Sequence, residues 1–277
     1  MTGLRFDIDS NYGLTRRVPP LLDLLDKYGL RATFFCVMGT DPSIPEIVRL
    51  RLRAKKTEKP AGSGPHAVGL KWRQLRKILY TLLRPRRVGS GHEDLLRQIA
   101  ARGHEVYPHG WSHIQWQRNL DRIDAQEHLD LCIRSHREIF GIAPAGFASP
   151  GRVVNETALG AFDTMGFQFS GDLDGKAPFY PEGRACMQIP VTWFVTIDEL
   201  RGGGLADGEI AEALAGHVLE REFSVLYEHP DNIYGAELAV LDRFYSIITE
   251  KGVEVCTFSE IFNRYREIAP RKSAPHV

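Results

Sequence analysis

The chain contains little cysteine. It has four cysteines in 277 residues, and no two of them form a Cys-x-x-Cys pair. They are far apart in the sequence, at Cys36, Cys132, Cys186 and Cys256, and two of them fall inside apolar strand-like runs. We therefore expect small buried residues in a reducing compartment rather than a disulfide framework.

Long apolar runs are also missing. No stretch of about eighteen uncharged apolar residues occurs, which argues against a membrane-spanning helix. The chain opens as MTGLRFDID, without a basic patch followed by an apolar stretch, so we expect no secretion signal and a cytoplasmic location. The glycine fingerprint of a dinucleotide-binding fold is absent as well.

The chain has no net charge, because 35 basic residues balance 35 acidic residues. The distribution is uneven: residues 51–90 carry twelve Lys and Arg against Glu58 alone, a local net charge of +11. Apolar residues make up 43% of the chain and charged residues 25%, an ordinary globular composition. This composition excludes a chain that is disordered throughout.

Short β-branched or aromatic runs alternate with segments of helical period, the pattern of parallel strands joined by helical crossovers. We expect strands near 3–9, 31–37, 104–109, 145–149, 167–172, 186–191, 223–229 and 253–257. Helices are expected at 18–29, 92–102, 123–140, 155–166, 207–220 and 236–251, with proline, asparagine and glycine at several of their ends. The predicted fold is an α/β barrel forming one domain over 1–277, with a basic helical insertion at about 40–90.

Several predicted strands end in residues that can carry chemistry. The first ends in Asp7 and Asp9, the third in His109 with His113 beyond it, the fifth in Asp172 and Asp174, and the seventh in His229. In a parallel barrel the carboxyl ends of the strands meet at one rim, so we expect these side chains to converge.

Two imidazoles and one carboxylate would make a catalytic metal site. His109 and His113 are four residues apart, which on a helix places both rings on one face, and Asp9 would complete the set. Zn is the favoured ion, with Mn, Co or Ni as alternatives. Asp7 could then accept a proton from water beside the ion, and His229 could donate one to a leaving amine. Taken singly, Asp-x-Asp and His-x-x-x-His are also compatible with purely structural roles.

At these residues the chain resembles the polysaccharide deacetylase superfamily. FDID, HGWSH, SGDLDG and LYEHP look like its first, second, fourth and fifth motifs. The resemblance implies a distorted seven-stranded (β/α) barrel, Asp7 as base, Asp9, His109 and His113 as metal ligands, His229 as general acid and Asp172 as a supporting residue. It also suggests substrate contacts at Trp111, Pro150, Gly151, Arg152 and Asp174.

The resemblance is strongest to the superfamily branch of formamido-arabinose phosphoundecaprenol deformylases, in LRFDIDS, HEVYPHGWSHIQWQ, GDLDGKAPFYP, MQIPVT and GVEVCTFSEI. It implies removal of formate from an amino sugar linked to a polyprenyl phosphate at the inner face of the membrane, in lipid A modification. The third motif departs from the pattern: GFASPGR has Phe147 or Ala148 where an arginine is expected, and Arg152 is the candidate to replace it.

Residues 70–87 place Trp72, Leu75, Leu79 and Leu82 at helical spacing between basic residues. They would form either a solvated charged face or a peripheral contact with anionic membrane. Twelve cations could also bind nucleic acid, but no base-reading motif accompanies them, and we expect no such partner. Two other functions stay open: a deacetylase of another N-acetylated saccharide, and an inactive carbohydrate-binding relative.

Overall fold

The computed structural model describes residues 1–40 and 87–272, and the predicted basic insertion and membrane contact lie almost wholly outside these residues. Its strands are β1 (Thr2–Ile8), β2 (Thr33–Cys36), β3 (Glu105–Pro108), β4 (Gly146–Phe147), β5 (Phe169–Ser170), β6 (Tyr180–Pro181), β7 (Met187–Gln188), β8 (Ser224–Glu228), β9 (Val255–Cys256) and β10 (Arg271–Lys272). Every predicted strand is present, in most cases shorter than expected.

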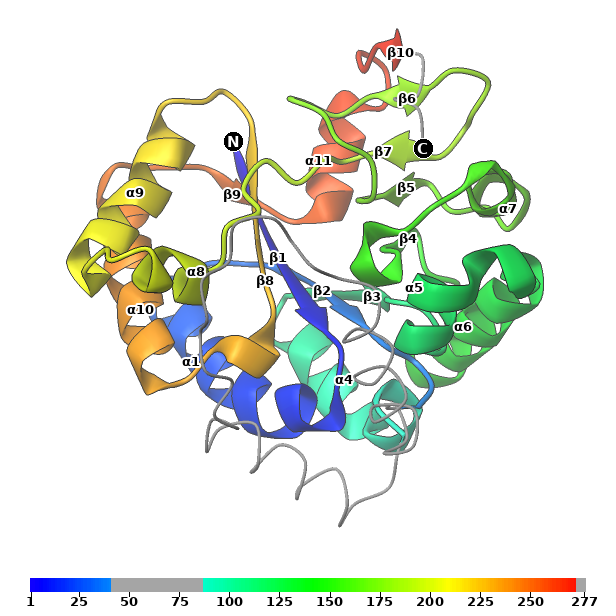
Figure 1. Ribbon diagram of the computed structural model, residues 1–277, viewed down its shortest axis with the longest axis horizontal. Helices are drawn as coiled ribbons and strands as arrows, with labels where there is room; N and C mark the ends of the chain where they lie inside the picture. The colour runs from blue at the N-terminus through cyan, green and yellow to red at the C-terminus, as the bar shows by residue number, and fades with distance from the viewer. Residues whose placement is uncertain (41–86, 273–277) are drawn as a thin grey trace, which may run out of the picture.

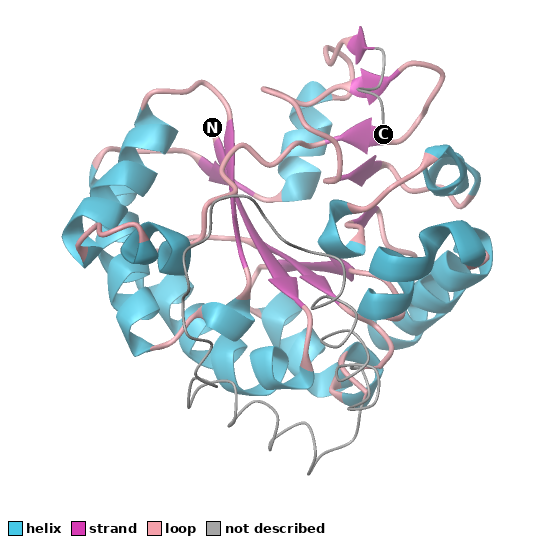
Figure 2. Ribbon diagram, in the orientation of Figure 1, coloured by secondary structure: helices cyan, strands magenta, loops and turns pink. Residues whose placement is uncertain are grey.

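Helices surround the strands, as Figures 1 and 2 show. The α-helices of the described residues are α1 (Val18–Lys27), α4 (Glu93–Ala101), α5 (His113–Asn119), α6 (Ala125–Phe140), α7 (Glu156–Thr164), α8 (Ile197–Gly202), α9 (Asp207–Leu219), α10 (Gly235–Glu250) and α11 (Phe258–Tyr265). Residues predicted to end helices do cap them. At the start of α7 the Asn155 side chain accepts a hydrogen bond from the N–H of Ala158. Gly141 takes a left-handed conformation (φ 77°) at the end of α6.

Seven parallel strands of the described chain form a distorted barrel, which confirms the predicted fold class. The barrel is built from two sheets, one that runs β3-β2-β1-β8, with β9 also paired to β1, and one that runs β4-β5-β7; β6 and β10 form a separate two-stranded sheet. The sheets meet at two seams, where the Ala148 N–H donates to the carbonyl of Pro108 and the Trp193 N–H donates to the carbonyl of Val225. The strands therefore follow one another around the barrel in chain order, as right-handed βαβ crossovers produce.

Alternating side chains on the strands separate two apolar layers. On β1, Leu4, Phe6 and Ile8 face the core between barrel and helices, whereas the intervening Arg5 and Asp7 are equally buried but belong to neither apolar cluster. The second cluster contains Phe35, Phe169, Met187 and Val225 from the strands together with Phe258 and Ile261 of α11. The period of two along a strand thus directs two charged side chains of β1 into the barrel.

All four cysteines are buried and unbridged, as the sequence predicts. In the described part of the chain, no helix combines the length and apolar character needed to cross a membrane.

Candidate metal and catalytic site

Three side chains predicted as metal ligands lie together at the carboxyl rim of the barrel. Asp9 follows β1, His109 follows β3, and His113 is the first residue of α5. One ligand atom from each lies within 4.8 Å of the other two. The closest pairs are His109 Nε2 to Asp9 Oδ1 at 3.4 Å and His113 Nε2 to Asp9 Oδ2 at 3.6 Å. Ligands about 2.1 Å from a tetrahedral zinc ion are roughly 3.4 Å from one another, so the spacing fits such an ion.

The hydrogen bonding of His109 also fits a cation. Its Nδ1 lies 2.8 Å from the carbonyl oxygen of Ala148, which can only accept, so Nδ1 carries the proton. Burial lowers the pKa of His109 to about 4 despite the nearby carboxylates of Asp7 and Asp9, and the ring is therefore neutral near pH 7. Its Nε2 lone pair and Asp9 Oδ1 then face each other, and both atoms are buried without a hydrogen-bond partner in the described structure. Two buried acceptors in this arrangement could both be satisfied by one metal ion between them.

His109 and His113 do not share one helical face, as we had expected. Only His113 belongs to a helix, while His109 extends β3. The chain turns between them at Gly110, which has φ 80°. A Cβ at Gly110 would approach Pro150 Cγ to 2.9 Å, so the tight turn needs glycine on both counts.

Asp7, predicted as the base, is held by Arg5, a residue for which the sequence predicted no role. Arg5 Nε and Nη2 donate to the two Asp7 oxygens at 2.8 and 2.7 Å, and both side chains are buried. Arg5 also donates to the carbonyl of Gly171 at 2.5 Å and lies 5.0 and 5.1 Å from the ring centroids of Phe35 and Tyr227. Burial raises the pKa of Asp7, but the charge and hydrogen bonds of Arg5 outweigh burial and bring it down to about 2. Asp7 is therefore ionised throughout the neutral range.

His229, predicted as the acid, lies directly after β8 and faces the same cluster. Its Nε2 is 3.6 Å from Asp9 Oδ2 and 2.7 Å from the hydroxyl of Tyr227. Burial raises the pKa of Tyr227, so its hydroxyl keeps its proton near pH 7. The Tyr227 hydroxyl thus orients the His229 ring, and its aromatic ring at the same time packs on Arg5.

Asp172 and Asp174 occupy different environments. Asp172 is buried, and its carboxylate accepts the N–H and the hydroxyl of Ser149 at 2.7 and 3.0 Å. Burial raises the pKa of Asp172, and the charge of Arg5 opposes that rise. Its hydrogen bonds go to the turn after β4, so the structure places it beside the predicted substrate-contact segment. Asp174 is exposed and forms an ion pair with Arg152.

Arg152, the candidate to replace the arginine missing from the third motif, lies in the turn after β4. Its Nη2 donates to the carbonyl of Asp172 at 3.2 Å and to the Asp174 carboxylate. Arg152 has φ 56°, the only positive φ of a non-glycine residue in the described chain. Such backbone strain persists where surrounding contacts fix the conformation, and it is common at functional sites.

The remaining predicted substrate contacts form one wall beside the histidines. The N–H of Trp111 donates to His128 Nε2 at 2.8 Å, which fixes the turn between His109 and His113. Pro150 is buried against Gly110, and a Cβ at Gly151 (φ 62°) would come within 2.4 Å of the Gln117 amide. The turn after β4 therefore packs directly on the turn after β3.

Two residues of the site, Arg5 and Tyr227, were missed, although the sequence contains a signal for each. Each precedes a predicted functional residue by two positions on a strand, and residues two apart share one face. An arginine inside the apolar run LRFDI is itself unusual unless the charge is paired.

The chain resembles known proteins both in sequence and in structure. The profile of a family described as polysaccharide deacetylase matches residues 1–170. A "Probable 4-deoxy-4-formamido-L-arabinose-phosphoundecaprenol deformylase ArnD" of Shewanella sediminis (strain HAW-EB3) is 30% identical over 203 residues, covering 72% of this chain and 65% of that protein. A protein of the same name from Wigglesworthia glossinidia brevipalpis is 28% identical over 197 residues, 66% of this chain and 65% of that one. The chain thus spans slightly less than two thirds of the length of the curated relatives it matches.

Solved structures share the fold at lower identity. A structure named a probable polysaccharide deacetylase from Pseudomonas aeruginosa PAO1 has a TM-score of 0.68 and 17% identity, and covers 98% of this chain and 92% of its own. The structure of PuuE allantoinase has a TM-score of 0.65 and 18% identity, and the match covers 98% of this chain and 91% of the allantoinase chain. At these identities the likeness concerns the fold alone.

Proposed function

Because the chain belongs to the polysaccharide deacetylase family and is similar to formamido-arabinose deformylases, we propose that it is a metal-dependent hydrolase of an N-acyl amide on an amino sugar. The acyl group proposed is formyl, and the sugar is carried on a polyprenyl phosphate, as the names of the relatives say of those proteins. The observation that carries the proposal is the cluster of Asp9, His109 and His113 with Asp7 and His229 directly beside it.

Asp9, His109 and His113 would hold one divalent cation, with zinc favoured over Mn, Co or Ni because two of the three ligands are imidazoles. Such an ion makes water more acidic and polarises an acyl carbonyl. Three protein ligands leave coordination positions open, as catalytic sites require.

Asp7 is proposed as the group that accepts the proton of the attacking water. Arg5 keeps it ionised and fixes the plane of its carboxylate, since both Asp7 oxygens accept from the same guanidinium. Asp7 Oδ2 lies 3.5 Å from His109 Nε2, so the base is in contact with the cluster. Its low pKa makes Asp7 a weak base that is always in the correct protonation state.

His229 is proposed as the proton donor to the leaving nitrogen. The water oxygen bonds to the acyl carbon, the carbon to nitrogen bond breaks, and the nitrogen takes a proton from His229, giving formate and a free amine. Tyr227 holds the ring for this transfer through the 2.7 Å contact to Nε2. We further propose that Asp172 supports the rim from below and that Trp111, Pro150, Gly151, Arg152 and Asp174 contact the sugar.

We also propose a membrane contact, a cellular location and a domain organisation for the protein. Contact with anionic membrane through residues 70–87 is retained as a prediction, and all of these residues except Arg87 lie outside the described chain. A position at the inner face of the cytoplasmic membrane would follow from the lipid-linked substrate. A single catalytic domain over residues 1–277 is likewise a proposal.

The test combines metal content with product release. Parent protein, Asp7→Asn and His109→Ala are analysed for bound zinc and for formate released from a formamido sugar. We expect Asp7→Asn to keep the metal and to lose roughly 10²–10⁴ in turnover, the range for removal of a general base. His109→Ala should lose both metal and activity.

His104→Ala is the matched control, because it removes a buried histidine at the opposite end of β3 and should leave metal content unchanged. An active, metal-free His109→Ala protein would contradict the proposal. Release of acetate but not formate would favour a deacetylase of another saccharide, and an inactive parent protein that still binds sugar would favour a carbohydrate-binding relative.

A further inference from the structure

Phe194 is an exposed aromatic residue in the segment between β7 and α8, and the sequence predicted no role for it. It leaves 42% of its surface exposed, whereas every other phenylalanine of the described chain is buried or half-buried. Single exposed apolar residues are common on protein surfaces, so exposure alone indicates no function. The position and the contacts of Phe194 carry the argument instead.

The register of the chain places Phe194 at the carboxyl end of β8. Trp193 forms a parallel bridge with Leu226, the third residue of β8. One residue further along each chain, Phe194 lies level with Tyr227, because neighbouring parallel segments advance together. With about 4.8 Å between neighbouring chains and about 3.3 Å per residue, the Cα atom of Phe194 is roughly 8 Å from that of His229. Phe194 therefore lies at the rim that carries the proposed acid.

The side chain of Phe194 points over the mouth of the barrel. Side chains alternate along an extended segment, and Trp193 packs against the core between the barrel and its helices. Phe194 takes the opposite direction, and its ring centroid is 4.3 Å from the guanidinium carbon of Arg152. Arg152 belongs to the turn after β4, so this contact reaches across the mouth from the β8 side to the β4 side.

The Phe194–Arg152 pair is next to the residue that orients the proposed acid. Burial raises the pKa of Tyr227, and the charge of Arg152 opposes that rise, so the guanidinium is close to the Tyr227 hydroxyl. That hydroxyl is 2.7 Å from His229 Nε2. His229 is proposed to protonate the leaving nitrogen, and this nitrogen is part of the sugar. The pair thus lies on the side of the site that the sugar would occupy.

The segment that carries Phe194 is held in place on both sides of it. The indole N–H of Trp193 donates to the carbonyl of Val195 at 2.7 Å. The N–H of Ile197 donates to the Glu228 carboxylate at 3.0 Å, which keeps the segment beside β8. A phenylalanine on a fixed backbone loses little conformational freedom when a ligand packs on it.

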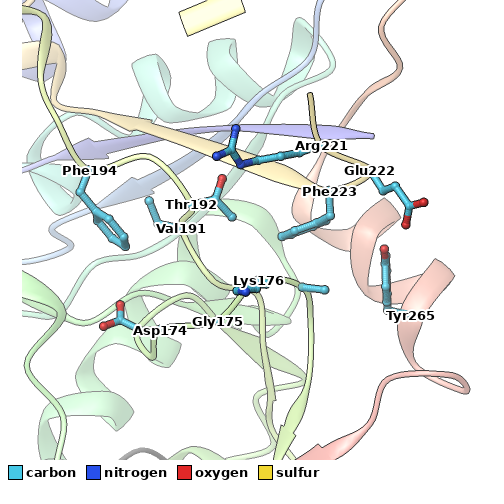
Figure 3. Close-up of a pocket in the computed structure, with 11 residues that line it drawn as sticks. Asp174, Gly175, Lys176, Val191, Thr192, Phe194, Arg221, Glu222, Phe223 and Tyr265 are labelled. Atoms are coloured by element: carbon cyan, nitrogen blue, oxygen red, sulfur yellow. The ribbon is translucent and has the colours of Figure 1, made fainter. Parts of the chain in front are cut away.

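Figure 3 shows Phe194 and Asp174 at one end of a cavity, with Glu222 and Tyr265 at the other. Glu222 precedes β8, at the end of that strand away from the rim, so only the end with Phe194 concerns the proposed site. Asp174 forms an ion pair with Arg152. The Phe194 ring is therefore bordered by a guanidinium and a carboxylate and is open to solvent on its remaining side.

This combination of groups suits a sugar ring. The faces of a sugar ring consist of C–H bonds, which the negative face of an aromatic ring attracts, and its edge carries hydroxyl groups. Arg152 can donate hydrogen bonds to such hydroxyls, and Asp174 can accept them. An alkyl chain would need a longer apolar surface than one ring, and the groups that border Phe194 are charged.

We propose that Phe194 is a specificity-determining residue, and that the sugar ring which bears the leaving nitrogen stacks on the exposed side of its aromatic ring. The inference rests on the proposed function and deepens it, because it assigns a place to the ring of the amino sugar. Phe194 acts by binding and orienting that ring, and Arg152 holds the aromatic ring from the other side.

The experiment compares a sugar substrate with a small amide that has no ring. kcat and KM are measured for the zinc-loaded parent protein, Phe194→Ala, Phe194→Tyr and Val195→Ala. The two substrates are the methyl glycoside of 4-deoxy-4-formamido-L-arabinose and N-propylformamide. We expect Phe194→Ala to lower the ratio of kcat/KM for the sugar to kcat/KM for the small amide by roughly three- to tenfold, mainly through KM for the sugar, because one aromatic contact is lost.

Two variants serve as controls for this ratio. Phe194→Tyr keeps the aromatic ring and should retain the parent ratio. Val195→Ala is the matched control, because Val195 is the next residue, is exposed to the same extent as Phe194 and alternates to the other side of the segment. It should also keep the parent ratio.

A binding measurement makes the test independent of turnover. The methyl glycoside of 4-amino-4-deoxy-L-arabinose, the amine that hydrolysis would release, is titrated calorimetrically into the same four proteins. Phe194→Ala should raise Kd by roughly three- to tenfold over the parent and over Val195→Ala. Equal affinity in Phe194→Ala and Val195→Ala would overturn the assignment, and so would a parent protein that does not bind the amine.

Two further results separate this inference from its alternatives. If Phe194→Ala binds vesicles of phosphatidylethanolamine and phosphatidylglycerol less than the parent does but binds the amine equally well, Phe194 is a membrane contact and the assignment fails. If the parent hydrolyses the sugar amide while ratio and affinity are the same in Phe194→Ala and Val195→Ala, the stacking role fails and the hydrolase stands. If the amine binds through Phe194 but the parent hydrolyses neither amide, the hydrolase fails and the sugar contact stands.

Discussion

Replacing Arg5 by methionine is the change whose consequences follow most directly from the structure. Methionine keeps a long, flexible side chain but removes the guanidinium that donates to both Asp7 oxygens and to the carbonyl of Gly171. Asp7 would then be a buried carboxylate without its partner. Breaking a buried ion pair from one side typically lowers the free energy of unfolding by about 3–5 kcal/mol, and we expect a loss in this range.

The double variant Arg5→Met with Asp7→Asn separates the lost charge from the lost packing. Because it removes both charges, it should recover at least half of the stability that Arg5→Met loses. The assay is urea unfolding at pH 5 and pH 8 with a chelator present, so that cation binding does not contribute.

The pH dependence gives a second, independent readout. In the parent protein the pKa of Asp7 is about 2, below its unfolded value, so Asp7 is ionised in both states between pH 5 and 8 and contributes no slope. Without Arg5, burial raises that pKa above the unfolded value, and the folded state of Arg5→Met should gain stability as the pH falls from 8 to 5. A loss below about 1 kcal/mol that is the same at both pH values would refute the reasoning, since buried pairs cost more than this to break.

Two further predictions concern β8. Burial raises the pKa of Glu228 to about 7, so its contribution to stability is present below its ordinary pKa of 4.5 and is lost as the pH rises through 7. The advantage of Glu228→Gln over the parent in unfolding free energy should therefore grow between pH 5 and 8, by up to about 3 kcal/mol, and an advantage that is constant with pH would contradict this. Tyr227→Phe removes the hydroxyl that contacts His229 Nε2, and we expect turnover to fall by roughly five- to tenfold with metal content unchanged, because one net hydrogen bond is worth about 1 kcal/mol. Unaltered turnover would show that the hydroxyl does not orient His229.

The main elements of the fold were readable from the sequence because local patterns determine them. Their length and end residues such as Asn155 located α6, α7 and α10 to within a few residues. Three short helices, α5, α8 and α11, were missed, because each has eight residues or fewer and so spans too little sequence for a helical pattern to be distinguished. The two-residue strands β6 and β10 pair only with each other, far apart in sequence, and carry no local signal.

The candidate site was predictable to the extent that residue chemistry defines it. Asp9, His109 and His113 could be named because few residue types bind zinc, and the parallel barrel brings strand ends together. The partner of Asp7 was missed, although Arg5 shares one face of β1 with Asp7 and a buried arginine is usually paired. That both Asp7 oxygens accept from the same guanidinium depends on side-chain directions, which the sequence pattern does not give.

The position of β1 between its neighbours has a consequence for how the protein is made. β1 pairs with β2, some thirty residues later, but also with β8, whose register matches Thr2 with Ser224. The strand that carries Arg5 and Asp7, with Asp9 directly after it, is therefore made well before β8, and its second edge stays open until more than two hundred further residues have been synthesised. Contacts of such long sequence separation form late. The ion that these residues are suited to hold would accordingly be acquired at the end of folding, and nascent chains arrested before β8 should be unable to retain it.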